Sequence, residues 1–175
     1  MRYVALLRGI NVGGATMMKM DALKAEFEGL CFENVRSYIN SGNIAFDTKK
    51  TSEKKLADKI EAAVEARFGR AVAVVVREQK DIGRILDNNP FAGEYESHKE
   101  MHVLFLKEGM PAEKAKLLTE AALEGERYEV KDTEIYAHLR TGVADSLLTK
   151  GFLDKKLKVV FTGRNWRTVE KLALL

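Results

Sequence analysis

The sequence lacks several features that would assign the protein to a class. Cys31 is its only cysteine, so the chain cannot form an internal disulfide, and the apolar neighbours Leu30 and Phe32 predict a buried side chain there. No apolar stretch approaches the ~20 residues that span a bilayer. The first residues do not resemble a secretory leader, because Arg2 and Arg8 enclose only a five-residue apolar run. We therefore expect a soluble, cytoplasmic protein with no membrane partner.

Templates for metal binding and catalysis are also missing. The histidines His98, His102 and His138 do not have the i, i+4 spacing of a metal site, and no cysteine pair accompanies them. The sequence contains no G-x-S-x-G nucleophile elbow. Nothing in it ties the hydroxyls of Ser41 or Ser146 to a base. No metal or cofactor is predicted, and the catalytic residues of an enzyme cannot be named.

The net charge of the whole sequence is small, but one segment has a marked excess of positive charge. The formal net charge is only +3, which is too small to indicate a nucleic-acid partner by itself. Residues 150–175 carry a charge of +5, against −2 for the preceding 149 residues. A basic face of this kind attracts phosphates. The alternative is an ordinary solvated helix surface.

The order of predicted elements in the first half is β-α-β-β-α-β. Hydrophobic periodicity predicts a strand over 2–8 and a helix over 17–29. A hairpin over 35–39 and 44–47 turns at N-S-G-N. Ser52 is a good N-cap for the next helix and Gly69 a good C-cap, and a strand over 71–76 follows. This order is that of the ferredoxin-like unit.

The second half repeats this order after a helix over 78–87. The pattern predicts a strand over 101–106, a helix opened by Pro111, a hairpin over 128–130 and 134–139, a helix over 143–152, a strand over 158–161 and a closing helix over 166–174. The predicted fold is α+β, with two ferredoxin-like subdomains whose mostly antiparallel sheets have helices on one face. The first sheet is predicted in the order 4-1-3-2. The predicted boundaries are 1–77, a connecting helix and loop over 78–99, and 100–175.

The most informative motif is R-G-I-N-V-G-G at residues 8–14, directly after the first predicted strand. Glycine-rich backbone beside an arginine can present several N–H groups to an anion. The motif matches neither G-x-G-x-x-G nor the phosphate loop that ends in G-K-S/T. The alternative is that its glycines serve only the turn. In a ferredoxin-like unit this loop and the N-S-G-N turn share one edge of the sheet, where they form a site or simply hydrogen-bond to each other.

A second cluster is T-G-R-N-W-R-T-V-E-K-L at residues 162–172. Either Thr162 or Asn165 can cap a helix there, which would leave free N–H groups beside Arg164 and Arg167 as an anion site. Trp166 either packs in the core or stacks on a ligand. The hypothesis is that this motif and the first-half motifs face one cleft. The candidate ligand-binding residues are Arg8, Gly9, Asn11, Gly13, Gly14, Asn40, Ser41, Gly42, Asn43, Ser146, Arg164, Asn165 and Arg167.

Three motifs in order carry a resemblance over nearly the whole chain, from Tyr3 to about Leu172. They are Y-V-A-L-L-R-G-I-N-V-G-G, Y-I-N-S-G-N and T-G-R-N-W-R-T-V-E-K-L. Together they resemble the bacterial family called domain of unknown function 1697. The resemblance implies two ferredoxin-like subdomains and no established activity. The chain departs from the family pattern at Asn40, Gly163 and Leu147, where glutamine, alanine and lysine are frequent.

Two function classes follow from these observations, and a third stays open. The first is a binding protein for a phosphate-bearing ligand, either a nucleotide or a nucleic acid. The second is an enzyme that acts on a small anionic metabolite between the subdomains, with residues such as Arg8 positioning the substrate. The third is a structural or protein-partner role. The oligomeric state is not predicted.

Overall fold

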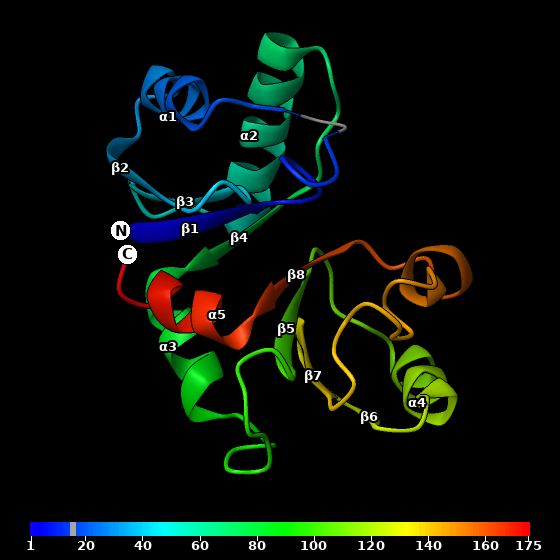
Figure 1. Cartoon of the computed structure of the whole chain (residues 1–175). Coiled ribbons are helices and arrows are strands. Elements are labelled where there is room, and N and C mark those ends of the chain that lie inside the picture. The colour runs from blue at the N-terminus through cyan, green and yellow to red at the C-terminus, as the bar shows by residue number, and fades with distance from the viewer. Residues whose placement is uncertain (15–16) are drawn as a thin grey trace. The chain divides into compact units, whose positions relative to one another are not determined.

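The structure is a computed structural model that describes residues 1–14 and 17–175. The chain forms two compact units, Met1–Ile85 with Glu170–Leu175, and Leu86–Val169 (Figure 1). Each unit contains one four-stranded antiparallel sheet. The predicted α+β class is therefore confirmed, and the two halves have similar βαββαβ order.

The first unit begins with the sheet that was predicted from the sequence. Its elements, with the helix that follows them, are β1 (Arg2–Leu7), α1 (Met20–Gly29), β2 (Glu33–Tyr38), β3 (Asn43–Asp47), α2 (Glu53–Phe68), β4 (Val74–Glu78) and α3 (Gln79–Asp87). The strand order is β2-β3-β1-β4, which confirms the predicted order read from the other edge. β3 is antiparallel to both β1 and β2, so β1 and β2 are parallel and their neighbouring loops meet at one edge.

Helices α1 and α2 cover one face of this sheet (Figure 1). The α2 helix begins as predicted, because the Ser52 hydroxyl oxygen accepts a hydrogen bond from the amide of Lys55 at 3.2 Å. It ends at Gly69 in the left-handed conformation. Its residues Ile60 and Val64 are fully buried against the sheet.

Aromatic rings form the centre of the first core. The Phe46 ring stacks on Phe32 with centroids 4.3 Å apart, and it meets the edge of Phe27 at 5.5 Å. Pairs of this geometry contribute about 0.5–1.5 kcal/mol each beyond the area they bury. The hydroxyl of Tyr3 donates to the carbonyl of Thr51 at 3.0 Å, so the polar end of this ring is also satisfied.

The second unit has the same strand arrangement, β6-β7-β5-β8. Its elements, with the closing helix, are β5 (Met101–Leu106), α4 (Ala112–Ala121), β6 (Glu126–Lys131), β7 (Glu134–Leu139), the π-helix η1 (Phe152–Lys156), β8 (Phe161–Asn165) and α5 (Trp166–Leu172). Its core is apolar and includes the fully buried Leu106, Leu118, Ile135 and Leu153.

Residues 143–152 do not form the predicted α-helix. Gly142 and Gly151 adopt φ values of +83° and +73° at the two ends of this stretch, and the residues between them form turns and bends. Ser146 donates its hydroxyl to a backbone carbonyl three residues earlier, at 2.7 Å. The amide of Leu147 donates to the carboxylate of Glu126 at 2.9 Å. It therefore bonds to a residue that is distant in sequence and not to a carbonyl of the preceding helical turn. The segment forms turns before η1.

The last strand also differs from the prediction, because it begins later. Lys158 has φ of +52°, and the amide of Val159 donates back to the carbonyl of Leu153 at 2.9 Å. The chain is therefore still closing the η1 turn where the strand was predicted. Thr162 and Arg164 pair with β5 in the strand, and α5 begins directly after this strand at Trp166.

Cys31 is exposed, and the prediction of a buried thiol was wrong. It directly follows Leu30 at the C-terminal end of α1 and takes φ of +63°, with its amide bonded to the carbonyl of Glu28 at 2.9 Å. This turn points the side chain to solvent although its neighbours are apolar. No helix among the described residues has the length and apolar character needed to cross a bilayer.

Candidate functional site

The loop of residues 8–14, here called the glycine loop, begins where β1 leaves the sheet. The amide of Leu7 donates to the carbonyl of Gly42 at 2.8 Å, and the amide of Arg8 donates to the carbonyl of Ala73 at 2.9 Å. These bonds anchor the loop to the turn before β3 on one side and to the residue before β4 on the other. The two first-half motifs therefore share one edge of the sheet, as the topology requires.

The sign of φ alternates along the glycine loop. Gly9, Asn11 and Gly13 have φ of +66°, +54° and +61°, whereas Ile10 and Val12 are not among the residues with positive φ. Left-handed residues of this kind occur in nests, where successive N–H groups turn toward the same side and can bind an anion. The positive φ values account for Gly9 and Gly13, since glycine adopts them without strain.

The glycines of this loop face open space. Gly9, Gly13 and Gly14 are exposed, and a Cβ atom added to any of them would meet no heavy atom within 4 Å. Within the described part of the chain, their amides donate to no partner. Ile10, which is 1% exposed, inserts into the core and holds the loop down. The surface of the loop at these glycines is therefore open to solvent.

Asn11 is a structural clamp. Its Oδ1 accepts from the amide of Met18 at 2.7 Å, while its Nδ2 donates to the carbonyl of Met18 at 2.9 Å and to that of Asn40 at 2.8 Å. Both Nδ2 hydrogens are therefore used within the first unit. Asn11 joins the glycine loop to the approach of α1 and to the turn before β3, so its role is to shape the loop.

The turn at residues 39–42 packs against the start of the glycine loop. Asn43 is fully buried, and its Nδ2 donates to the Ser41 hydroxyl at 2.9 Å and to a carbonyl at the end of β2 at 3.0 Å. Gly42 has φ of +81°, and a Cβ atom there would lie 2.8 Å from Cβ of Leu7 and 2.9 Å from Cδ1 of Ile10. Hydrogen bonds and packing between this turn and the glycine loop therefore explain why Ser41, Gly42 and Asn43 occur here.

Exposed apolar side chains flank the glycine loop. Val12, Met17 and Ile39 are 56%, 76% and 51% exposed. Each is adjacent in sequence to a residue that the Asn11 clamp joins. Ile39 also has φ of +48°, a strained conformation for a β-branched residue, and such strain is concentrated at functional sites. We call these three residues the apolar rim.

The candidate residues of the C-terminal motif lie in the second unit and have unequal exposure. Arg164 is 8% exposed, and its Nη1 donates to the Thr162 hydroxyl at 2.7 Å and to the carbonyl of Gly163 at 2.8 Å. Burial lowers the pKa of the Arg164 guanidinium to about 10, which keeps it protonated at neutral pH. Asn165 caps α5 by accepting from the amide of residue 168 at 2.9 Å, and Arg167 is exposed. Asn165 is therefore the cap, one of the two predicted alternatives, and Arg164 lies directly before it at the end of β8. An anion site at this helix start stays a prediction.

Ser146 and Trp166 are both buried. Ser146 is fully buried, and its hydroxyl is used in the turn that follows Gly142. Trp166 is 6% exposed and meets the ring of Tyr95 edge-on with centroids 6.2 Å apart, as expected of a packing residue. Neither side chain is presented to solvent as a ligand contact. A joint surface of the motifs from both halves stays a prediction.

The chemistry available at the glycine loop is recognition of an acceptor-rich group. The loop amides and the Arg8 guanidinium are donors, and no carboxylate is among the residues of the loop. In the part of the chain that the structure describes, no three His, Cys, Asp or Glu side chains are grouped to hold a metal ion. A loop with amide donors, a guanidinium and no carboxylate suits an anion better than a cation.

Comparisons with known proteins agree with this fold. Among solved structures, the chain is similar to a conserved bacterial protein from Streptococcus pneumoniae, with 28% sequence identity and a TM-score of 0.72 over 99% of this chain and 97% of that one. No curated protein matches significantly. A family model with the description "Protein of unknown function (DUF1697)" matches residues 1–136. The chain therefore belongs to the DUF1697 family.

Proposed function

We propose that the first unit binds a phosphate-bearing ligand, a nucleotide or a nucleic-acid strand, with the glycine loop holding a phosphate group. The observation that carries the proposal is the alternating φ of residues 9–13 together with exposed amides that bond to no described residue. Phosphate oxygens are strong acceptors and satisfy several converging N–H groups at once. Arg8 adds positive charge where the loop begins.

The apolar rim favours a ligand that is more than an inorganic anion. Val12, Met17 and Ile39 expose hydrocarbon beside the amides, and an exposed apolar surface next to polar groups is typical of a binding site. A nucleotide combines a phosphate with a flat base that can cover such hydrocarbon. The proposal therefore assigns the phosphate to the glycine loop and the base to the apolar rim.

An enzyme acting on a small anionic metabolite is the alternative, and it would use the same anion contact. The polar side chains near the loop are already used in hydrogen bonds within the first unit: Asn11 donates to the carbonyl of Asn40, and Asn43 donates to the hydroxyl of Ser41. They are therefore poor candidates for a nucleophile or a base. Turnover of a bound nucleotide, detected by product analysis, would favour the enzyme over the binding protein.

The proposal is tested by equilibrium binding of ATP and of a fluorescently labelled single-stranded oligonucleotide to the full chain. Gly13→Ala forces a side chain into the left-handed region and should move the amides out of line, weakening binding at least about tenfold, the value of one charge-assisted hydrogen bond. Gly69→Ala is the matched control, because Gly69 has φ of +70° and equally open surroundings but caps α2. Binding through phosphate should also weaken as salt rises.

Equal losses of affinity in the two variants would contradict the proposal, since the effect would then follow general destabilisation. Undetectable binding of both probes by the wild-type protein would also overturn it.

A further inference from the structure

The end of β5 in the second unit is built like the end of β1 in the first. The amide of Leu106 donates to the carbonyl of Thr133 at 2.8 Å, and the amide of Lys107 donates to the carbonyl of Val160 at 2.9 Å. These two bonds are the counterparts of those made by Leu7 and Arg8 at the end of β1. Lys107 therefore occupies the place in the second unit that Arg8 occupies in the first.

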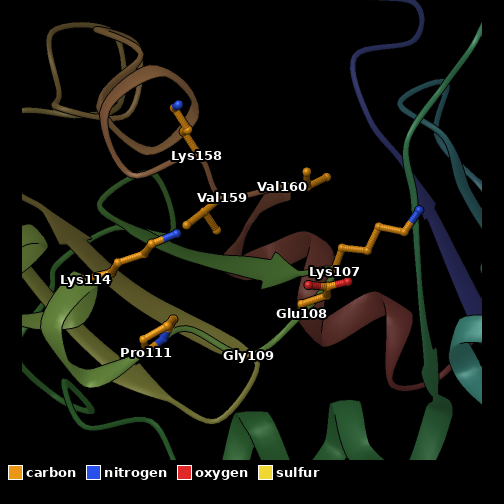
Figure 2. A pocket seen from close by; sticks show the side chains of 8 residues that line it. All are labelled: Lys107, Glu108, Gly109, Pro111, Lys114, Lys158, Val159 and Val160. Atoms are coloured by element: carbon orange, nitrogen blue, oxygen red, sulfur yellow. The ribbon is translucent and has the colours of Figure 1, made fainter.

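A cavity lies beside this second strand end. Its volume is about 190 Å³, and the loop after β5, the start of α4 and the turn before β8 enclose it. Lysines come from all three segments, namely Lys107, Lys114 and Lys158. Figure 2 shows that Lys114 extends toward the turn that carries Val159, whereas the side chains of Lys107 and Lys158 extend away from Lys114, to the right and upward in this view. We call this the lysine cavity.

The charge of the lysine cavity is not balanced from within. Glu108 is the single carboxylate among the residues that line it. In the described chain, Lys114 and Lys158 form no ion pair, whereas Lys116 on the same helix pairs with Glu120 at 3.7 Å. Three lysines against one carboxylate give the lining a positive potential, which attracts an anion.

The start of α4 adds to the positive potential. Pro111 lines the cavity and occupies the N-cap position, where it provides no side-chain acceptor for the first-turn amides of this ten-residue helix. The positive end of the helix dipole therefore lies at the cavity wall. Val159 and Val160 form an apolar part of the lining, which limits hydration of whatever enters.

The volume limits the size of the ligand. Pockets for drug-sized molecules measure about 300–1,000 Å³, so the lysine cavity is too small to enclose a whole nucleotide. It is large enough for several water molecules or for one tetrahedral anion. Flexible lysine side chains suit an anion with more than one negative charge, because each can approach a different oxygen.

We infer that the lysine cavity of the second unit is a binding site for a small, multiply charged anion of the phosphate class, separate from the glycine loop. The ligand is inorganic phosphate or the terminal phosphate of a larger molecule whose remainder stays outside the cavity. Lys114 contacts the anion from within the cavity, and Lys158 closes over it from the rim. The site goes beyond the nucleotide-binding role proposed for the first unit and does not depend on it.

The test is a titration of the ¹⁵N-labelled full chain with inorganic phosphate, followed by amide chemical shifts at constant ionic strength. We expect saturable shifts over residues 107–114 and 158–160. The double variant Lys114→Gln, Lys158→Gln should weaken this binding at least tenfold. Lys116→Gln removes a lysine from the same helix but outside the cavity, and should leave the affinity unchanged.

Titrations with pyrophosphate and with a phosphate monoester separate the two sources of the ligand. Saturable binding of the monoester indicates the terminal phosphate of a larger molecule, because the rest of that molecule stays outside the cavity. Binding of inorganic phosphate or pyrophosphate without the monoester indicates a free anion. Shifts that do not saturate, or an equal loss of affinity in Lys116→Gln, would overturn the inference. Residues 9–14 report the glycine loop independently in the same spectra. Failure at one site is therefore distinguishable from failure at the other.

Discussion

Gly42 is the position where one methyl group should disturb both the fold and the candidate site. In Gly42→Ala the new Cβ would lie 2.8 Å from Cβ of Leu7 and 2.9 Å from Cδ1 of Ile10, with φ of +81°. The left-handed conformation costs a non-glycine residue about 1–2 kcal/mol. Overpacking of a core costs about 1–3 kcal/mol more. We expect a loss of about 2–5 kcal/mol in the free energy of unfolding.

Gly69→Ala separates the two terms, because Gly69 has φ of +70° and nothing within 4 Å of an added Cβ. It should cost only the conformational term of about 1–2 kcal/mol. Urea denaturation followed by far-ultraviolet circular dichroism measures both variants. Since Leu7 and Ile10 bracket the start of the glycine loop, Gly42→Ala should also weaken nucleotide binding. Equal destabilisation by the two substitutions would refute the steric argument.

Three further predictions concern polar groups inside each unit. Asn11→Ala should lower the free energy of unfolding by about 1–2 kcal/mol more than Asn34→Ala does. The reason is that the Asn11 side chain makes three hydrogen bonds to backbone, whereas the Asn34 side chain donates one to Asp47. Equal losses in urea denaturation would contradict the structural role of Asn11. Glu126→Ala should cost about 2–4 kcal/mol, since the buried carboxylate accepts from two amides and the Tyr128 hydroxyl, whereas the exposed Glu129→Ala control should be near neutral. Burial raises the pKa of Tyr136 to about 12, and burial with the Glu126 hydrogen bond raises the pKa of Tyr128. Because these values exceed the unfolded pKa of about 10, the stability they contribute is intact below pH 10 and is lost as pH rises from there toward 12. Ultraviolet titration in which all tyrosines ionise near pH 10 would contradict this.

Local signals were sufficient for the first unit. Ser52 and Gly69 mark both ends of α2, and the apolar spacing between them identifies the buried face. The N-S-G-N turn follows from its composition, and the strand order follows from the ferredoxin-like connection. These features depend on neighbours in sequence, which is why they could be predicted.

The errors lie where tertiary partners decide the structure. Residues 143–152 have a helical pattern, but Leu147 bonds to the distant Glu126, and the chain forms turns instead. Of the two predicted caps of the last helix, Asn165 is confirmed, whereas Thr162 lies in β8 and pairs with β5, which no local signal reveals. Cys31 has apolar neighbours, but its left-handed φ turns it outward.

The candidate site was predictable in part. The motif at residues 8–14 indicates a loop with open backbone, whereas the clamp role of Asn11 depends on contacts with Met18 and Asn40. The lysine cavity was not predicted, because its three lysines are 7 and 44 positions apart along the chain. Alignment of the two halves at Arg8 and Lys107 is the one signal that could have indicated it.

The central claim is that the amides of the glycine loop bind phosphate. The most direct measurement is an ¹⁵N chemical-shift titration of the full chain with ATP, read at Gly9, Gly13 and Gly14. The account predicts saturable downfield shifts of these amide protons, with smaller changes at Ile39 in the apolar rim and none at Gly69. Unchanged resonances at Gly9, Gly13 and Gly14 at saturating ATP would contradict it.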